Sequence, residues 1–395
     1  MKTWPMIPLA DLAAKKTGSV DPAKYPNESF DLYSIPAFDA GQPEVRAGSE
    51  IGSTKQIVQP HDILLSKIVP HIRRTWVVGE NRGRRIIASG EWIVFRSDKV
   101  RPDFLRNFLL GDPFHTQFMR TVSGIGGSLV RARPSEVFKI KMPLPSLVEQ
   151  ERIVKLLDEA NDLRKLRAQA DSRTTALIPA LFNEMFGDLK SNLRNWNFVT
   201  IGDILAKPVQ NGAYFPKEMY VDDNEGVEMV HMGDAFHGVV KRGKLKRVNC
   251  GPDERKKYSV NNNDILIARR SINYEGAAKP CLVPPIAEPL IFESSLIRVT
   301  PDPKKIDRVF LFAYLWDPVA REKFVLPNVT RSTISGINQA GLLRIRVPLP
   351  PLLLQKEFAR RIAEIREFEA GQAASRESVE CLFQSMLHRA FNGEL

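Results

Sequence analysis

The sequence contains the same pattern twice, and this duplication constrains the fold more than any other feature. Residues 141–145 (KMPLP) recur as residues 346–350 (RVPLP), 205 residues later, and the same offset continues through a long helical pattern after each copy. Two tandem copies therefore fill nearly all of the 395 residues. Such a chain is expected to fold into two similar units. Two similar surfaces suit a partner that repeats along its own length, as duplex DNA does.

The composition favours a globular protein with an anionic partner. The chain carries 57 Lys and Arg against 46 Asp and Glu, a formal net charge of +11, and its mean hydropathy is −0.22. Excess positive charge favours nucleic acid, although many basic proteins bind none. The first residues lack the apolar core of a signal peptide, and no stretch approaches the roughly 18 apolar residues of a membrane span. We therefore expect a cytoplasmic protein with no membrane partner.

A heptad pattern follows each Pro-Leu-Pro motif. From residue 148 to residue 185 the first helix would be about 57 Å long if unbroken. Apolar residues recur three and four positions apart in both copies, which is the spacing of a coiled coil. A globular segment precedes each helix, so we expect the two helices to pack antiparallel. The predicted contact residues are Ile153, Leu156, Ala160, Leu163, Leu177, Phe358, Ile362, Ile365, Phe368, Val379 and Leu382.

Two residues interrupt these helices. Pro179 is expected to kink or end the first helix near Ala176, and Gly371 in the second helix costs about 1 kcal/mol relative to alanine. The apolar stripe is also poorest around the middle of each helix. One interpretation is a bent or segmented helix pair. The other is that the weak middle and the final turns are docking surface for other subunits.

The globular segments before the helices resemble each other as well. Trp4 and Asp11 correspond to Trp196 and Asp203, and residues 62–67 (DILLSK) correspond to residues 264–269 (DILIAR). The latter pattern is typical of a short buried strand that ends at a basic residue. We expect strands at residues 86–89, 92–95, 264–268, 290–292 and 296–299, and helices at residues 103–119 and 307–324. Each segment is therefore predicted to be a mixed domain, and the fold class is α+β.

Basic residues concentrate beside turns in the globular segments, where they could contact phosphate. A second paired feature, residues 124–131 (GIGGSLVR) and 329–336 (VTRSTISG), combines small, hydroxyl and basic residues that could follow a DNA groove. The bland alternative is an ordinary solvated surface. The candidate DNA contacts are Lys67, Arg73, Arg74, Arg84, Arg85, Ser128, Arg131, Lys241, Arg242, Arg269, Arg270, Arg331, Ser332 and Thr333.

The sequence offers no convincing catalytic or metal site. The three cysteines have no CxxC spacing and are expected to be reduced thiols. Residues 124–127 lack the GKS or GKT ending of a phosphate-binding loop. The Pro-Pro pairs at residues 284–285 and 350–351 lack the flanking residues of a base-binding methyltransferase loop. His231 and His237 are six positions apart, off one helical face. We therefore predict no catalytic residue and no metal ligand.

The chain resembles the specificity subunits of Type I restriction-modification enzymes. The resemblance rests on residues 142–150 (MPLPSLVEQ) and 347–355 (VPLPPLLLQ), each leading into a long helix, and on the closing residues 390–395 (AFNGEL), answered by residues 185–188 (MFGD). It implies two pseudo-symmetric target recognition domains, at residues 1–145 and 189–350, separated by an antiparallel pair of helical spacer regions at residues 146–188 and 351–395.

The resemblance also implies partners and cofactors. Each recognition domain would bind one half of a bipartite double-stranded DNA site, and the helices would dock two methyltransferase subunits and set the distance between half-sites. Restriction or translocase subunits would complete a system that defends against foreign DNA. S-adenosylmethionine and ATP would belong to these partners, so no cofactor is expected in this chain. Two alternatives remain: a DNA-modifying enzyme that acts alone, and a coiled-coil assembly protein whose basic domains bind acidic proteins.

Overall fold

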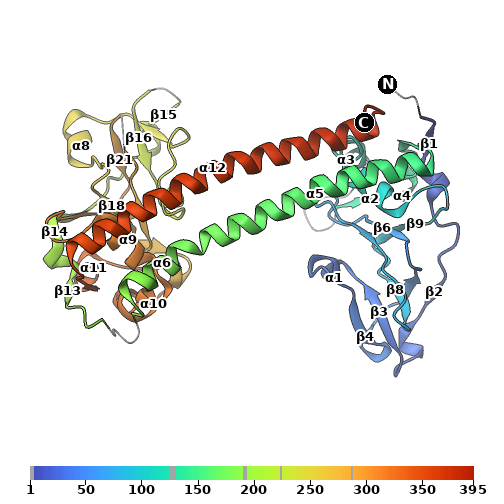
Figure 1. Ribbon diagram of the computed structural model, residues 1–395, viewed down its shortest axis with the longest axis horizontal. Helices are drawn as coiled ribbons and strands as arrows, with labels where there is room; N and C mark the ends of the chain where they lie inside the picture. The colour runs from blue at the N-terminus through green and yellow to red at the C-terminus, as the bar shows by residue number, and fades with distance from the viewer. Residues whose placement is uncertain (1–3, 124–129, 190–193, 223–224, 286–287) are drawn as a thin grey trace. The chain divides into compact units, whose positions relative to one another are not determined.

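The computed structural model describes residues 4–123, 130–189, 194–222, 225–285 and 288–395. Contacts divide the chain into two units, shown in Figure 1. Unit 1 comprises Met1–Gln169 and Ala373–Leu395, and unit 2 comprises Ala170–Gln372. Each unit therefore contains one globular domain and a part of each long helical region. The four-domain boundaries expected from the sequence remain a prediction.

The domain of unit 1 is built on a three-stranded antiparallel sheet in the order β7–β6–β9. Its central strand β6 (Ile63–Ser66) pairs with β7 (Thr75–Val77) and β9 (Trp92–Phe95). Every residue of β6 is buried because both faces of the sheet are covered. Ile63 and Leu65 join a core that includes residues of helices α2 (Pro102–Leu110) and α3 (Asp112–Arg120), whereas Leu64 packs into a separate cluster with Trp92.

A second sheet in unit 1 has five strands in the order β2–β5–β8–β3–β4. In this sheet β3 and β8 are parallel, and the other described neighbours are antiparallel. Helix α1 (Ile35–Asp39) follows β3 directly. The strands are β2 (Ser19–Val20), β3 (Ser29–Tyr33), β4 (Glu44–Ala47), β5 (Lys55–Ile57) and β8 (Arg85–Ala88).

The domain of unit 2 repeats this plan with two four-stranded sheets. One has the order β14–β22–β18–β20, and the other has the order β15–β17–β16–β21 with β16 and β21 parallel. Helices α9 (Arg308–Trp316) and α10 (Pro318–Ala320) follow β22. The strands are β14 (Leu205–Asn211), β15 (Tyr220–Val221), β16 (Val227–Val230), β17 (Arg247–Val248), β18 (Ile265–Ala268), β20 (Pro280–Leu282), β21 (Leu290–Phe292) and β22 (Leu296–Pro301). The α+β fold class expected from the sequence is confirmed.

The repeated Pro-Leu-Pro motif closes each domain. Strand β12 (Lys141–Pro143) pairs antiparallel with the first strand of its domain, β1 (Met6–Pro8). In unit 2 the same pairing joins β24 (Arg346–Pro348) to β13 (Phe198–Thr200). Each domain therefore begins and ends on two adjacent strands, and the chain passes from the second of them into a long helix.

A buried glutamine joins the start of each long helix to its domain. The Gln150 amide oxygen accepts a hydrogen bond from the Arg101 backbone N–H at 2.8 Å, and its nitrogen donates to the Pro145 carbonyl at 2.9 Å. The Gln355 amide accepts from the Asp307 N–H at 2.8 Å and donates to the Pro350 carbonyl at 2.7 Å. Both side chains are fully buried. This bonding explains why both motifs place glutamine at the same distance from the Pro-Leu-Pro segment.

The long helices differ in continuity. The first region contains α5 (Leu147–Thr175) and α6 (Leu177–Phe186), so it breaks at Ala176 as predicted from Pro179. The second is the single helix α12 (Leu352–Phe391), which continues through the exposed Gly371. None of the helices in the described part of the chain combines the length and hydropathy that a bilayer span requires.

Within each unit the parts of the two helical regions run antiparallel. In unit 1, Arg152 of α5 donates to the Leu395 carbonyl at 2.6 Å, and Arg164 further along α5 pairs with Glu380 of α12 at 2.8 Å. In unit 2 the ring of Phe186 lies 5.2 Å from that of Phe358 in α12, while Ile178 of the preceding turns faces Ile362 across a pocket. The antiparallel direction expected from the sequence is confirmed.

The buried stripe on these helices departs from the predicted one. Ile153, Ala160, Phe358 and Ile362 are buried, and Leu156, Ile365 and Val379 are partly buried. Leu163, Leu177, Phe368 and Leu382 are instead 47–59% exposed. The prediction assumed a period of 3.5 residues, but a straight helix has 3.6 and rotates the stripe by about 20° per heptad. Along α5 the facing row therefore passes through Leu157 and reaches the polar Arg164 in place of Leu163.

Candidate nucleic-acid interface

In unit 1 the exit of strand β6 is joined to the glycine-rich segment identified in the sequence. Lys67 follows β6, and its carbonyl accepts from the Ala132 N–H at 2.8 Å. The Val69 N–H donates to the Val130 carbonyl at 3.0 Å, and Ile68 forms a β-bridge with Arg131. The structure therefore brings Lys67 and Arg131, 64 residues apart in sequence, into neighbouring segments. Ser128 lies outside the described residues.

Unit 2 repeats this junction with clearer geometry. Strand β19 (Arg270–Ser271), just after β18, pairs with β23 (Ser335–Gly336). The segment before β23 is a closed loop because the backbones of Thr330 and Gly336 exchange two hydrogen bonds, of 2.8 and 3.1 Å. The Arg331 guanidinium lies over the Tyr274 ring, 4.7 Å from its centre. We call residues 330–336 the closed loop of unit 2.

The predicted contacts of unit 2 on this junction are mostly accessible. Arg270, Arg331, Ser332 and Thr333 are exposed, whereas Arg269 is half-buried and donates to the Ser294 carbonyl at 3.3 Å. The Ser332 hydroxyl donates to the Ile334 carbonyl at 2.7 Å, which stiffens the tip of the loop. An exposed surface with two arginines and two hydroxyl side chains can donate hydrogen bonds to phosphates and base edges.

The structure adds two residues that the sequence interpretation missed. Ile272 is 82% exposed and Ile334 is 57% exposed. Each is the residue next to the Ser271–Ser335 pair, Ile272 after β19 and Ile334 before β23. Two exposed β-branched side chains beside arginines can contact thymine methyl groups. The available signal was an isolated isoleucine between small polar residues in each segment, SIN and TIS.

Several predicted arginines of unit 1 are instead held by carboxylates. Arg74 is buried and makes two hydrogen bonds to Asp39, of 2.8 and 2.9 Å. This hydrogen bonding lowers the pKa of the Asp39 carboxyl below its ordinary value. Arg73 pairs with Asp112 at 2.6 Å and donates to the Leu110 carbonyl at 2.9 Å. These guanidinium groups join distant parts of the domain, and their role in DNA contact remains a prediction.

The arginines around strand β8 are held in the same way. Arg84 pairs with the buried Asp31 at 2.7 Å. Arg85 forms an ion pair with Glu28, whose pKa is lowered chiefly by that hydrogen bond, and lies over the Tyr25 ring at 4.2 Å. A phosphate would have to displace the carboxylate before either arginine could bind it.

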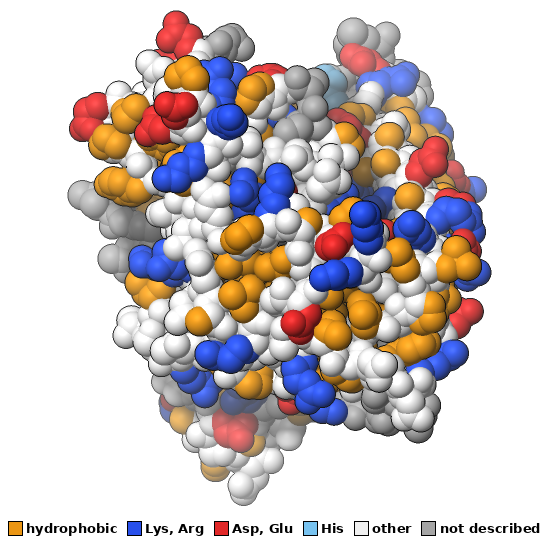
Figure 2. Space-filling view, turned by 90° about the vertical axis from the view of Figure 1, so that its left-hand side faces the viewer, with side chains coloured by type: hydrophobic (Ala, Val, Ile, Leu, Met, Phe, Trp, Pro, Cys, Tyr) orange, Lys and Arg blue, Asp and Glu red, His pale blue; other side chains and the backbone are white. Residues whose placement is uncertain are grey.

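The remaining candidates also divide into arginines held by carboxylates and exposed basic residues. Arg131 pairs with Glu91 at 3.2 Å, although its side chain is 43% exposed. In unit 2, Arg242 forms an ion pair with the buried Glu228, while the adjacent Lys241 is exposed. Of the basic residues that the sequence singled out, those best placed for a ligand are Lys241, Arg270 and Arg331. Figure 2 shows Lys and Arg side chains spread over much of the face turned to the viewer, with Asp and Glu at fewer points.

A buried aspartate fixes the turn before each central strand. Asp62 accepts from the Gln59 N–H at 2.8 Å and is bound by Arg96 with two contacts of 2.6 Å. Asp264 accepts from the Asn261 N–H at 2.9 Å and from the Thr300 hydroxyl at 2.6 Å. The repeated Asp-Ile-Leu pattern therefore positions β6 and β18, and these carboxylates are engaged in structural bonds.

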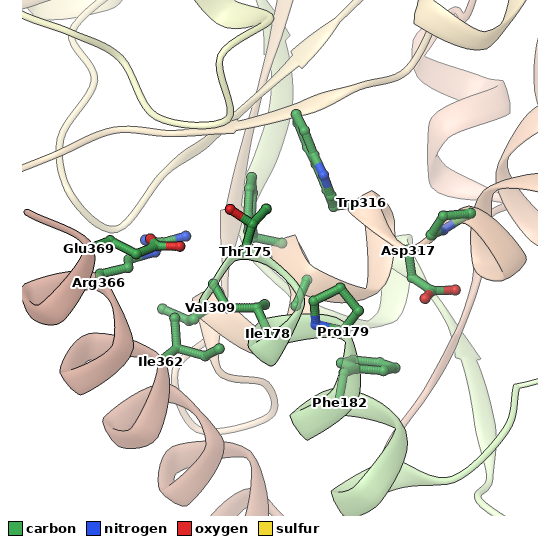
Figure 3. Close-up of a pocket in the computed structure, with 13 residues that line it drawn as sticks. Thr175, Ile178, Pro179, Phe182, Val309, Trp316, Asp317, Ile362, Arg366 and Glu369 are labelled. Carbon is green, nitrogen blue, oxygen red and sulfur yellow. The ribbon is translucent and has the colours of Figure 1, made fainter. Parts of the chain in front are cut away.

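An apolar pocket of about 230 Å³ lies in unit 2 between α6, α9 and α12, as Figure 3 shows. Phe182 and Ile362 line it, and Arg366 and Glu369 stand at its polar side. At the corresponding position of unit 1 a pocket of about 210 Å³ is lined by Leu157, Asn161, Phe383 and Leu387, among others. Burial lowers the pKa of Arg366. The two pockets occupy matching places in the repeat but differ in polarity.

Comparisons with known proteins agree on one family. The model of the Type I restriction modification DNA specificity domain matches residues 194–373. The Type I restriction enzyme StySPI specificity subunit of Salmonella potsdam is 26% identical over 371 residues, covering 86% of this chain and 76% of that protein. The EcoKI specificity subunit of Escherichia coli K12 is 23% identical over 303 residues, covering 68% and 61%. The chain is therefore similar to Type I restriction enzyme specificity subunits over most of its length.

Solved structures show the same fold. A chain from a structure titled as the assembly and conformational transition of the type I R-M system has a TM-score of 0.67 and 20% identity, covering 99% of this chain and 98% of the other. The S subunit of M. genitalium has a TM-score of 0.53 and 12% identity, covering 98% and 96%. The architecture of this chain therefore occurs in other structures despite low sequence identity.

Proposed function

We propose that this specificity subunit recognises a bipartite DNA sequence, with the domain of each unit contacting one half-site. The observation that carries the proposal is the repeated junction described above. In both units a basic residue directly follows the central strand. The backbone beside it pairs with a distant segment rich in small, hydroxyl or basic residues. Surfaces of this composition provide phosphate contacts for affinity and base contacts for specificity.

Partner subunits carry out the catalytic steps in this proposal. The relatives are named specificity subunits of restriction enzymes. We infer that this chain is non-catalytic, that S-adenosylmethionine and ATP bind to methyltransferase and restriction subunits, and that the complex acts in the cytoplasm. The structural engagement of the buried Asp62 and Asp264 supports this inference, since neither carboxylate is free to act in a reaction.

The helical regions are proposed to dock two methyltransferase subunits. In unit 1, Leu163, Leu166 and Leu382 are 48–61% exposed on α5 and α12. In unit 2, Leu177 and Phe368 are 47% and 59% exposed on α6 and α12. Exposed apolar side chains gathered on a helix are typical of surfaces that other proteins cover. Where the apolar stripe between the two helices is weak, apolar side chains of the same helices are therefore exposed on their outer faces.

Methylome sequencing of cells with and without this gene tests the proposal. We expect a bipartite methylation pattern that disappears when the gene is deleted and returns with a plasmid copy. Purified complex with methyltransferase subunits should bind that sequence above unrelated duplexes. Equal affinity for all sequences would contradict the proposal. Methyl transfer from labelled S-adenosylmethionine by this chain alone would favour the enzyme hypothesis instead.

A further inference from the structure

Unit 2 contains an open groove of about 920 Å³, and none of the DNA-contact residues predicted from the sequence lines it. It lies beside the sheet β15–β17–β16–β21 and is lined by residues that include Lys217, Lys244, Lys246, Arg247, Tyr214 and Tyr220. Among the described residues that line it, Asp222 is the one carboxylate. With His231 taken as neutral, the four cations and one anion among these described residues give a formal charge of +3. We call this feature the basic groove.

Unlike most of the candidate arginines, the lysines of the basic groove are not held by carboxylates in the described structure. Lys217, Lys244 and Lys246 are exposed, and none of the three forms an ion pair with a residue that the structure describes. The fourth cation, Arg247, donates to the Glu225 and Gly226 carbonyls at 2.8 and 3.0 Å and pairs with Glu288 at 3.3 Å. Arg247 therefore shapes the groove, while the three ammonium groups can bind an external anion.

Aromatic hydroxyl groups complete the lining. Tyr214 is 82% exposed. The Tyr220 hydroxyl lies 2.9 Å from His231 Nε2, and His231 Nδ1 lies 3.0 Å from the Met229 carbonyl. Because a carbonyl only accepts, Nδ1 carries hydrogen, and Nε2 of the neutral ring accepts from Tyr220. Burial, with smaller contributions from Glu293 and Tyr214, raises the pKa of Tyr220, so its hydroxyl stays neutral and does not repel an anion.

We propose that the basic groove binds the phosphodiester backbone of duplex DNA next to the half-site recognised by unit 2. This inference rests on the proposed function. Three ammonium groups with no ion pair in the described structure line an open concave surface, and the phosphates of a duplex offer them a regular line of negative charge. The tyrosines are polar and aromatic without net charge, so they can pack against sugars and donate to phosphates. Contacts of this kind add affinity and fix orientation without selecting a sequence.

The test uses the full chain in complex with methyltransferase subunits and a duplex that contains its methylated sequence. Affinity is measured by fluorescence anisotropy over a range of salt concentrations for wild type and the double variant Lys244→Ala/Lys246→Ala. Loss of two phosphate contacts should reduce the slope of log affinity against log salt by about 1.8. Between 50 and 200 mM salt, the wild-type affinity should then fall about tenfold more than that of the variant. The alanine variant should lose affinity by the same factor for the specific duplex and for unrelated duplexes.

Two controls keep the inference falsifiable. Lys256→Ala/Lys304→Ala removes two exposed charges of unit 2 outside the groove and should keep the wild-type slope. Lys244→Arg/Lys246→Arg keeps the charge and should also behave as wild type. If the alanine variant keeps the wild-type slope while wild type still prefers its bipartite sequence, the proposed phosphate contact at the groove is overturned. The proposed function then remains intact. Absence of any sequence preference in wild type would overturn the proposed function itself.

Discussion

At the start of each long helix a buried glutamine side chain joins three parts of the chain. Gln355 satisfies the N–H of Asp307, at the beginning of α9, and the carbonyl of Pro350, at the end of the motif that precedes α12. Gln150 does the same for Arg101 and Pro145. Sequence alone shows the recurrence of this residue but not its purpose, because the Asp307 and Arg101 backbones lie about 50 residues away.

Replacing this glutamine should destabilise the domain. Gln355→Ala leaves a buried N–H and a buried carbonyl without partners, which we expect to lower the free energy of unfolding by about 1 to 3 kcal/mol. Urea denaturation measures the change. Gln384→Ala is the matched control, since Gln384 lies exposed on the same helix and bonds only to the partly buried Glu380 in the described structure. Equal effects of the two substitutions would contradict the structural role of Gln355.

A carboxylate in the first turns of α12 gives a pH dependence of stability. Glu357 accepts hydrogen bonds from Arg360 and Arg361, which lower its pKa from 4.5 to about 2. Its stabilising contribution is therefore complete above about pH 4.5 and is lost as the pH falls toward 2. Glu357→Gln should reduce the thermal unfolding temperature slightly at pH 7, and the difference from wild type should shrink steadily below pH 4.5. A constant difference would contradict this assignment.

The elements were predicted unevenly, and the reasons are physical. The break at Ala176 followed from Pro179, because a proline removes a local backbone donor wherever it stands in a helix. The seam between the helices was misplaced by one position near Leu163, because a small difference in period accumulates along the chain. The arginine candidates were harder still. Arg74 is held by Asp39, 35 residues earlier, and such distant pairing has no local sequence signal.

The two exposed isoleucines beside the β19–β23 pair, Ile272 and, in the closed loop, Ile334, provide a prediction at this scale. Ile272→Ala/Ile334→Ala should change the unfolding free energy by no more than about 0.5 kcal/mol, because both side chains are exposed. If the isoleucines contact thymine methyl groups, the same variant loses about 1 to 3 kcal/mol of discrimination in one half-site. Replacing thymine by uracil in that half-site should weaken binding of wild type but not of the variant. An equal effect of uracil on both proteins would exclude the contact.

At the scale of the whole molecule, the duplication predicts independent recognition. The resemblance to the family and the two copies of each motif could be inferred from the sequence, because motif spacing and register are read directly from the chain. The basic groove and the exposed isoleucines could not, because they depend on how loops fold back onto sheets. Both features belong to unit 2 alone among the sites described, so the two half-sites are expected to be bound by different chemistry.

Single substitutions in the two units should therefore alter different halves of the target. We expect Arg270→Ala in unit 2 to relax or weaken only one half-site, and Lys67→Ala in unit 1 to affect only the other. Methylome sequencing of cells that carry each variant measures this directly. Loss of both half-sites in equal measure from either substitution, with the complex still assembled, would contradict independent recognition.

The pairing of β1 with β12, and of β13 with β24, has an evolutionary consequence. Since the entrance and exit of each domain are neighbours, a foreign domain with the same two terminal strands could replace it as a cassette. Gene crossovers within the codons of those two terminal strands would then create new target specificities in one step, and the surrounding assembly would tolerate the exchange.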